Sequence, residues 1–437
     1  MLSAAVEYPA GDRSKPRIFC DMTNILSYVR GHTTVTGVQR VVLRIAGHLV
    51  AAHGADVVRG IAWHPKRRRV VEIDLGFLDG EYRFDTHAAQ FARDMDILVH
   101  TGPRPRGVAR LGAKARKLRW KLLGMPGYGR RLVPPSVRMG DRILLMAPLF
   151  RQDEYLDFLA SRKAAGNRVY QLIHDVMPLT MPWLSHPGRD IEFRRFLGRT
   201  PEYVSQFLCV SDQTEADLKT VAAAIGVDIP SRVTPMAHEF IGAKDGHEAV
   251  RHAVRAIGEF PFILCVGTIE LRKNVLSLCK VWARLQQEFG IGLPRLVLAG
   301  RHGWLSEEVV SFLHATGDLG GYAHVVEAPS DADLAFLYRS CLFTVFPSLY
   351  EGWGLPIGES LWFGKYCIAS GTSSMPQVGG DLVDYIDPYD LDEIRKALLR
   401  ALTDPHHVAA REKQIEAATM RRWSDVAEEI DRIVRAD

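Results

Sequence analysis

The chain has 437 residues, of which 47% are hydrophobic and 24% charged, and its formal net charge is +4 at pH 7. These values fit a soluble globular protein of roughly two or three domains with a large core. No apolar stretch is long enough to span a membrane, and the polar N-terminus lacks the apolar centre of a signal peptide. We therefore expect a protein of the cytoplasm.

The six cysteines are scattered and lie mostly inside apolar runs, at positions 20, 209, 265, 279, 341 and 367. None forms a Cys-x-x-Cys pair, which argues against a zinc site and against a disulfide framework. Buried free thiols in a reducing compartment fit this pattern. No metal or other cofactor is expected.

Positive charge is concentrated in residues 104–142, since they hold twelve arginines and lysines and a single acid, Asp141. Leucines and a tryptophan are interleaved with the charges, as in basic segments that bind an anionic membrane surface. A solvated basic insertion and RNA binding are the alternatives, but no aromatic-rich recognition motif favours nucleic acid as a partner. We expect membrane contact through Lys114, Arg116, Lys117, Arg119, Trp120 and Lys121.

The first half of the chain alternates apolar runs typical of buried strands with amphipathic stretches typical of helices. We expect one helix from Thr36 to about His53, and another that is capped by Ser211 with help from Glu215. The expected strands cover residues 17–22, 57–63, 70–74, 97–100, 142–147, 168–173 and 207–210.

A second series of strands and helices follows residues 241–258, whose glycines and charges are typical of a linker. A helix should open within residues 267–274 and run to about Glu288. The strands expected here cover residues 262–266, 295–299, 324–327, 342–346 and 366–369. The remaining tail, residues 405–437, is predicted to be helical and polar.

Strands that alternate with helices form parallel sheets. The sequence thus predicts an α/β fold of two Rossmann-like, doubly wound parallel-sheet domains, residues 1–240 and 259–404. In such folds ligands bind at the carboxyl ends of the strands, so the active site is expected in the inter-domain cleft.

The most informative stretch is residues 346–360, Phe-Pro-Ser-Leu-Tyr-Glu-Gly-Trp-Gly-Leu-Pro-Ile-Gly-Glu-Ser. The glycines allow a tight turn, and Pro356 suits the first turn of a helix that should end near residue 363. Glu351 then lies in the loop and Glu359 lies about a turn inside the helix. Two carboxylates can hold sugar or ribose hydroxyls while N–H groups at the helix start hold phosphate, a combination that suits a sugar nucleotide.

This stretch resembles the Glu-x7-Glu motif of retaining glycosyltransferases of family 4, also called glycosyl transferases group 1, which have the two-domain GT-B fold. The strings Gly364-Lys365 and Ala369-Ser370 add to the resemblance. It implies a metal-independent enzyme that transfers a sugar from a nucleotide diphosphate with retention of configuration. It also implies that Glu351 holds sugar hydroxyls, that Glu359 holds the ribose and that the last helix packs back on the first domain.

Lys273 follows a predicted strand and begins a helix, where a lysine can neutralise a diphosphate. Gly-Thr-Ile-Glu-Leu-Arg-Lys-Asn, residues 267–274, resembles the phosphate-binding segment of the same family, although Thr268 replaces a frequent arginine and Leu271 a frequent proline. Because that arginine is missing, part of the diphosphate charge must be met by Arg272 or Arg301. The resemblance adds Thr268, Gly354 and Leu355 to the donor-binding set.

The string His-Asp-Val-Met-Pro begins where a predicted strand ends, and it resembles the active-site segment of the family. The resemblance implies that His174 lies beside the transferred sugar and stabilises positive charge at the anomeric carbon, while Asp175 orients the acceptor hydroxyl. By itself, a histidine at this position is more often structural. Gly37, in a turn that resembles one branch of the family, is expected near the donor phosphate, and Arg40 on the acceptor side.

The pattern around residues 267–274 looks like that of branches that use GDP-mannose, so mannose is the expected sugar, with uridine and thymidine diphosphate sugars still open. The expected partners are a nucleotide sugar, a lipid-linked saccharide acceptor and the inner face of a membrane. Surface polysaccharide synthesis is the expected process. A sugar-nucleotide epimerase on the same fold and a non-catalytic sugar-binding scaffold are the alternatives.

Overall fold

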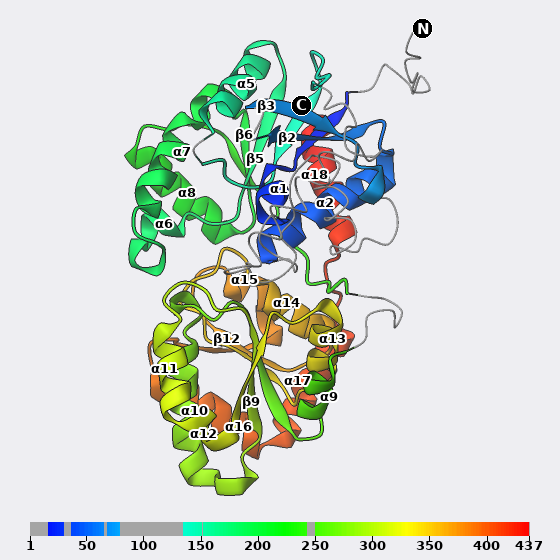
Figure 1. Ribbon diagram of the computed structural model, residues 1–437. Coiled ribbons are helices and arrows are strands. Elements are labelled where there is room, and N and C mark those ends of the chain that lie inside the picture. The colour runs from blue at the N-terminus through cyan, green and yellow to red at the C-terminus, as the bar shows by residue number, and fades with distance from the viewer. Residues whose placement is uncertain are drawn as a thin grey trace, which may run out of the picture. The chain divides into compact units, whose positions relative to one another are not determined.

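The computed structural model describes residues 16–29, 36–64, 68–78, 134–150, 152–242 and 250–436 (Figure 1). The chain divides into two compact units, here called the first and the second unit. The first comprises residues up to 172, residues 200–207 and residues from 427 onward. The second comprises residues 173–199 and 208–426.

A seven-stranded sheet is built from residues 18–233. Its strands, in spatial order, are β3 (Arg69–Ile73), β2 (Val58–His64), β1 (Ile18–Asp21), β4 (Arg142–Leu145), β5 (Arg168–Ile173), β6 (Gln206–Cys209) and β7 (Ser231–Val233). Strand β1 is parallel to β2 and to β4 and is completely buried. Because both faces of the strand are buried, its first three residues are hydrophobic without alternation, and the fourth, Asp21, is a buried acid.

At the edge of this sheet β3 runs antiparallel to β2, unlike the parallel pairs that β1 makes. The two strands are separated by only a few residues, and so short a connection cannot cross back over the sheet as a parallel pairing requires. The predicted strand at 97–100 lies outside the described residues.

The helices that follow these strands agree with the amphipathic pattern. Ser211 is confirmed as an N-cap, since its hydroxyl accepts from the Thr214 amide at 3.0 Å. Glu215 instead pairs with Lys219 and accepts from Ser231. The elements are α1 (Thr23–Val29), α2 (Gly37–His53), η1 (Gly76–Leu78), α5 (Asp153–Ala164), α6 (Met177–Thr180), η2 (Pro182–Leu184), α7 (Arg189–Tyr203) and α8 (Asp212–Ala224).

The second sheet has six parallel strands from residues 262–386. In spatial order they are β10 (Ala323–Glu327), β9 (Arg295–Gly300), β8 (Phe262–Val266), β11 (Thr344–Phe346), β12 (Cys367–Ser370) and β13 (Asp384–Ile386). Only β13 is absent from the sequence-based expectation. At three residues, of which only Ile386 is buried, it is too short and too polar to give a strand pattern.

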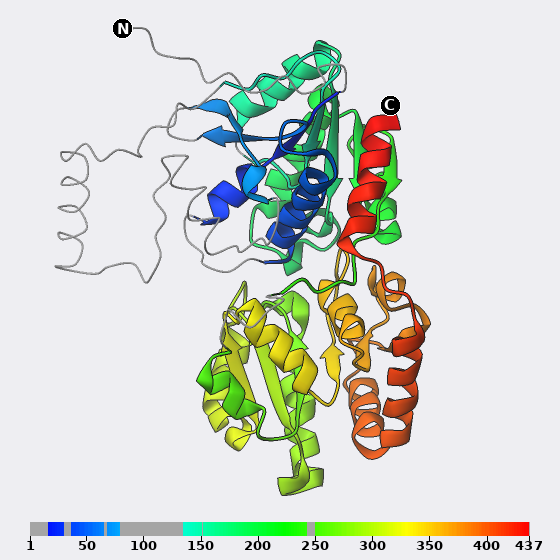
Figure 2. The same cartoon turned by 90° about the vertical axis from the view of Figure 1, so that its right-hand side faces the viewer.

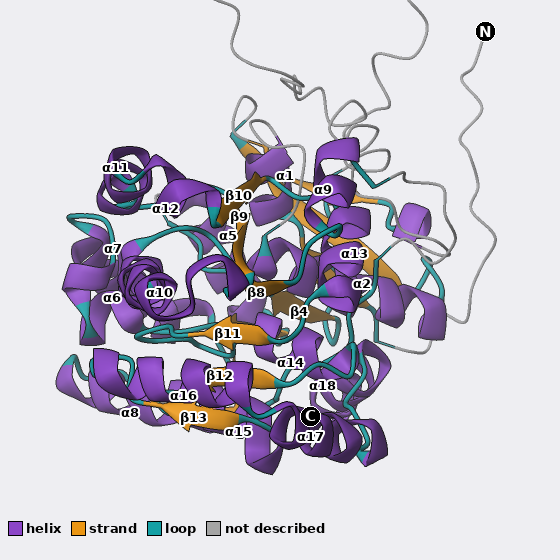
Figure 3. Cartoon of the chain, turned by 90° about the horizontal axis from the view of Figure 1, so that it is seen from below, coloured by secondary structure: helices purple, strands orange, loops and turns teal. Residues whose placement is uncertain are grey.

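Helices cover both faces of this sheet, as Figure 3 shows. One buried cluster joins the sheet to α10, α11 and α16, and a separate cluster joins its other face to α9 and α13. The elements are α9 (His252–Ile257), η3 (Leu271–Lys273), α10 (Val275–Phe289), η4 (Gly290–Gly292), α11 (Glu307–Ala315), α12 (Gly317–Gly321), α13 (Asp331–Ser340), α14 (Leu355–Trp362), α15 (Met375–Gly379), η5 (Gly380–Leu382), α16 (Leu391–Thr403) and α17 (Pro405–Ala417).

The last helix, α18 (Trp423–Ala436), ends in the first unit. There the Val434 carbonyl accepts hydrogen bonds from the Arg142 guanidinium at 3.1 Å and from the Tyr170 hydroxyl at 3.3 Å. Figure 2 shows this helix in red at the C-terminus. The expected polar tail is amphipathic instead, because α18 buries Ile430 and Val434 completely. Among the described residues, no helix has the length and apolar character needed to cross a membrane.

The strand ends β8 and β9 approach each other so closely that Gly300 has no room for a side chain. A Cβ at this position would lie 1.7 Å from the carbonyl oxygen of Gly267. Gly300→Ala should therefore lower the free energy of unfolding by about 1–3 kcal/mol or more, measured by urea denaturation. Gly292→Ala is the matched control, since its Cβ would have no neighbour within 4 Å. Equal stability of the two variants would contradict the packing described here.

Candidate functional site

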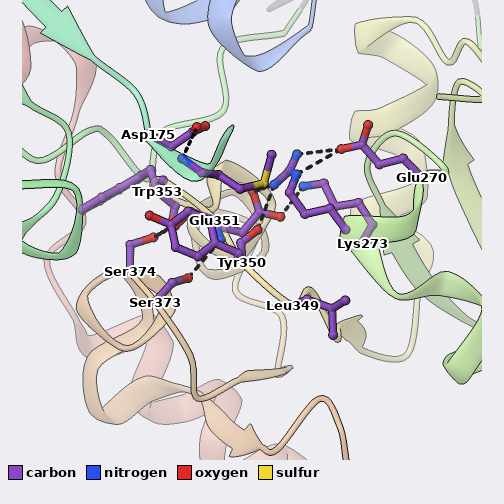
Figure 4. Close-up of polar contacts among 12 residues, drawn as sticks. Asp175, Glu270, Lys273, Leu349, Tyr350, Glu351, Trp353, Ser373 and Ser374 are labelled. Atoms are coloured by element: carbon purple, nitrogen blue, oxygen red, sulfur yellow. Dashed lines mark hydrogen bonds and ion pairs between the residues drawn. The ribbon is translucent and has the colours of Figure 1, made fainter. Parts of the chain in front are cut away.

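The two segments that the sequence singled out meet at one edge of the second sheet. The loop around Glu351 follows β11, and η3 follows β8, the strand that pairs in parallel with β11. Carboxyl ends of neighbouring parallel strands lie side by side, which brings Lys273 and Glu351 together (Figure 4).

The Glu351 carboxylate binds two cations at once. Its Oε1 accepts from Nζ of Lys273 at 2.6 Å, and its Oε2 accepts from Nη1 of Arg272 at 2.5 Å. Glu351 and Lys273 are both more than nine-tenths buried. The Lys273 ammonium also lies 4.7 Å from the ring centre of Phe346, at a distance that suits a cation–π contact.

Burial favours the neutral form of Glu351, but Arg272 and Lys273 outweigh it and lower the pKa of this carboxyl to about 2. The pKa of Arg272 is raised, because its neighbouring carboxylates outweigh the effect of burial. The site thus holds permanent charges of both signs in a desolvated place, where their fields are stronger than in water.

Arg272 is held on several sides. Its Nη2 donates to Oε1 of Glu270 at 2.8 Å, and its Nη1 donates to the carbonyl of Tyr350 at 2.9 Å. Its own carbonyl accepts from the amide of Leu349 at 2.8 Å. These contacts fix η3 against the loop before Glu351.

The backbone of the Glu351 loop is held by two serines (Figure 4). The Glu351 amide donates to Oγ of Ser373 at 2.9 Å, while the Ser374 hydroxyl lies 2.8 Å from the Glu351 carbonyl and 2.9 Å from that of Trp353. The Tyr350 hydroxyl donates to Asp217 at 2.6 Å. Burial and this bond raise the pKa of Tyr350, which stays neutral.

His174 and Asp175 lie next to this loop in the second unit. A Cβ on Gly352 would come within 1.8 Å of the His174 carbonyl oxygen, so only glycine fits there. Oγ1 of Thr214 lies 3.3 Å from the carbonyl oxygens of both His174 and Gly352. The structure therefore brings the His-Asp string and the Glu351 loop together.

Asp175 accepts from the Met177 amide at 3.1 Å. Burial raises the pKa of Asp175, against the opposing charges of Arg272 and His174, and Glu351 raises it further. A carboxyl with a raised pKa is a stronger base than an ordinary aspartate, which fits a group that accepts or shares a proton.

The turns after β8 and β9 are joined by backbone hydrogen bonds. The Ile269 amide donates to the Arg301 carbonyl at 2.7 Å, and the Gly303 amide donates to the Ile269 carbonyl at 2.8 Å. A small pocket beside them is lined by Gly267, Thr268, Lys273, Phe346 and Ser348, among others. Its volume of about 10 Å³ holds roughly one water molecule, so a larger ligand would lie over it.

Helix α14 begins at Leu355, after Gly354 in the left-handed conformation with φ of 104°, which favours glycine. Glu351 precedes α14 in the chain by a short glycine-rich turn. Glu359 lies within α14, is 6% exposed and accepts from the Tyr338 hydroxyl at 2.9 Å.

Two groups of predicted residues are not part of this cluster. Gly37 and Arg40 lie in the first turn of α2, in the first unit, where Gly37 is exposed. The predicted membrane contacts, residues 114–121, lie outside the described residues. Within the part of the chain that the structure describes, no group of three or more His, Cys, Asp or Glu side chains is placed to hold a metal.

Several residues of the site were missed from the sequence. Glu270 lies inside the quoted phosphate-binding string, but its pairing with Arg272 depends on the 3-10 turn of η3, which spacing does not reveal. Tyr338 and Asp217 come from helices distant in sequence. Gln377 accepts from the amide of Asp212, the first residue of α8, at 2.9 Å.

The charge cluster makes the stability of the second unit depend on pH. Because the pKa of Glu351 is about 2 in the folded chain against 4.5 ordinarily, its stabilisation is present above pH 4.5 and is lost as pH falls towards 2. Glu351→Gln should lower the free energy of unfolding by about 3 kcal/mol at pH 7. This difference from wild type should be about 1 kcal/mol smaller at pH 4.

Urea denaturation at the two pH values measures both numbers. Glu288→Gln is the control, because Glu288 forms an exposed ion pair with Arg395 at 2.7 Å, of a kind worth at most about 1 kcal/mol. A Glu351→Gln effect no larger than the control, or one that grows as the pH falls, would contradict the charged cluster.

Comparison with known proteins places the second sheet in a family. Residues 248–421 match the family described as glycosyl transferases group 1. Over 143 residues the chain is 36% identical to O-antigen chain mannosyltransferase B of Escherichia coli, in a match that covers 33% of this chain and 37% of that protein. Over 213 residues it is 26% identical to the MMP alpha-(1->4)-mannosyltransferase of Mycolicibacterium hassiacum, with 48% of each covered. The chain spans less than half the length of these curated relatives.

Two solved structures resemble nearly the whole chain. Sucrose-phosphate synthase of Thermosynechococcus elongatus has a TM-score of 0.61 at 16% identity and covers 97% of this chain and 99% of its own. HepE of Anabaena, solved with UDP and glucose, has a TM-score of 0.60 at 13% identity and covers 97% of this chain and 100% of its own. As the motif around Glu351 implied, residues 248–421 belong to the glycosyl transferases group 1 family, and the chain has the GT-B fold.

Proposed function

We propose that the protein is a retaining glycosyltransferase that moves mannose from GDP-mannose to a lipid-linked or polysaccharide acceptor in surface polysaccharide synthesis. The observation that carries this proposal is the buried Glu351 carboxylate between Arg272 and Lys273 at the start of α14. The mannosyltransferase names of the relatives support mannose as the sugar.

The cations would stabilise the departing diphosphate. Lys273 and Arg272 supply fixed positive charge, and the first amides of α14 supply further donors. In the reaction the bond from the anomeric carbon to the diphosphate oxygen breaks, and a bond to the acceptor oxygen forms on the same face of the sugar. Negative charge grows on the leaving oxygen, where preorganised charges lower the barrier most.

The carboxylates would hold the donor. Since the low pKa of Glu351 keeps it ionised, it can accept hydrogen bonds from sugar hydroxyls, while Glu359 accepts from the ribose. Thr268 and Arg301, together with the backbone at Gly354 and Leu355, would complete the contacts with the diphosphate.

The acceptor side would use His174 and Asp175. The His174 carbonyl carries partial negative charge that can stabilise the positive charge developing at the anomeric carbon. Asp175 would orient the acceptor hydroxyl. The proton of this hydroxyl passes to Asp175 or to the departing diphosphate. Gly37 and Arg40 of α2 are proposed to contact donor phosphate and acceptor, and the reaction is proposed to need no metal.

A donor screen tests this function. The purified protein is incubated with a panel of sugar nucleotides, and release of the nucleotide and the configuration of the product are followed by chromatography and NMR. We expect GDP release from GDP-mannose to be the fastest, with retained configuration and no loss on adding EDTA. Conversion of the donor sugar without nucleotide release would favour an epimerase instead.

Variants of the site residues, measured in the same assay, test whether turnover depends on this site. Lys273→Ala and Glu351→Ala should each lower turnover at least about a hundredfold, the effect of losing one preorganised charged group. Lys219→Ala and Glu288→Ala remove exposed charges of the same types and should leave turnover unchanged. Near-normal turnover and unchanged donor saturation in both site variants would exclude this site assignment.

We also propose that the protein acts at the inner face of the membrane, held by the basic segment at residues 104–142. Each basic residue near an anionic surface contributes about 1 kcal/mol, and the attraction weakens as salt rises. Vesicle sedimentation should show binding to anionic but not neutral lipid. Binding should be lost in high salt and in a variant with glutamine at Lys114, Arg116, Lys117, Arg119 and Lys121. Binding that ignores lipid charge or survives these substitutions would contradict this role.

A further inference from the structure

A buried tyrosine holds the second carboxylate of the site. Tyr338, in α13, is completely buried, and its hydroxyl donates to Oε2 of Glu359 at 2.9 Å. Glu359 itself is 6% exposed. A desolvated carboxylate needs donors to remain charged, and a phenol is a donor that does not itself carry charge.

The tyrosine ring is fixed by other aromatic rings. It stacks on Phe363 with ring centroids 5.1 Å apart at 14°, and it meets Phe240 at 6.1 Å and 65°. Phe240 and Phe363 also contact each other at 5.2 Å. With the ring immobilised, the hydroxyl oxygen is held 2.9 Å from Oε2 of Glu359 and 3.5 Å from the Pro356 carbonyl oxygen. The shorter contact helps to set where Oε2 of Glu359 lies.

The helix that carries Tyr338 is anchored at its other end. Ser330 and Asp333 form a reciprocal capping box at the start of α13, and the Arg251 guanidinium pairs with Asp333 at 2.6 Å. These contacts fix the start of α13 on a separate part of the chain, so the position of Tyr338 does not depend on a ligand.

We propose that Tyr338 is a positioning residue for Glu359 and thereby sets the affinity of the site for the ribose of a nucleoside diphosphate. This inference rests on the proposed function, in which Glu359 accepts hydrogen bonds from the ribose. A carboxylate that is held through one oxygen has a fixed orientation. A fixed orientation favours binding of a rigid pair of neighbouring hydroxyls, such as those of a ribose. Tyr338 acts only through Glu359 and contacts no reacting atom.

Tyr338→Phe removes the hydroxyl and keeps the stacked ring. Binding of GDP and UDP, each beside its 2′,3′-dideoxy counterpart, is measured by calorimetry, and kcat and KM for the preferred donor are measured separately. We expect affinity for the preferred nucleotide to fall roughly five- to tenfold, the effect of one hydrogen bond of ordinary strength. KM should rise by the same factor with kcat within about twofold, and the dideoxy nucleotide should bind both proteins equally.

Tyr366→Phe is the matched control. The hydroxyl of Tyr366 donates to the Asp384 carboxylate at 2.7 Å, and this residue is also buried in the second unit. Loss of this hydroxyl tests whether removing any buried tyrosine–carboxylate hydrogen bond weakens nucleotide binding. We expect nucleotide binding as in wild type. A second variant, Glu359→Gln, should lower the affinity for the ribose nucleotide at least as much as Tyr338→Phe does. Adding Tyr338→Phe to Glu359→Gln should change this affinity little.

The outcomes separate this inference from the proposed function. If wild type binds a nucleoside diphosphate but Tyr338→Phe binds it equally well, the inference is overturned and the function stands. Equal weakening of the ribose and dideoxy nucleotides, or equal weakening in Tyr366→Phe, also overturns it, because the effect is then general. If wild type binds neither GDP nor UDP, the proposed function and the inference both fail.

Discussion

The site depends on one constraint, which is that a buried carboxylate must be paired. Glu351 is 6% exposed, and burial alone would favour its neutral form. Two cations from a neighbouring strand end reverse that preference. Removing one partner of such a group is costly, because the other is left charged in a desolvated place. The positions of η3 and of the loop after β11 are therefore tied to each other by charge as well as by the sheet.

Further contacts follow from this pairing. Arg272 forms ion pairs with both Glu270 and Glu351, so its guanidinium cannot move without breaking at least one of these pairs. Two serines hold the backbone of the Glu351 loop, and the absence of a side chain at Gly352 lets the loop reach His174. The charges are thus preorganised before any ligand binds, which is the condition under which electrostatic stabilisation of a leaving group is effective.

The sequence predicts the main part of this arrangement. Apolar runs identify most strands, and glycine and proline around Glu351 identify the turn and the start of α14. It fails where a contact depends on tertiary structure, as with Tyr338 and Glu359, or where a segment is short, as with β13. The sequence predicts the strand β3 but not its antiparallel direction, because an apolar strand pattern contains no direction. The amphipathic end of α18 was missed because its average composition is polar, and only its 3.6-residue period separates the buried side from the exposed one.

The central claim is that Arg272 and Glu351 form one coupled unit in the folded protein. A double-mutant cycle with Arg272→Met and Glu351→Gln, measured by urea denaturation at pH 7, tests it most directly. We expect the double variant to lose less stability than the sum of the single variants, by more than about 1 kcal/mol, since each single change already breaks the pair. Additive losses would show that the two side chains contribute independently and would contradict the account.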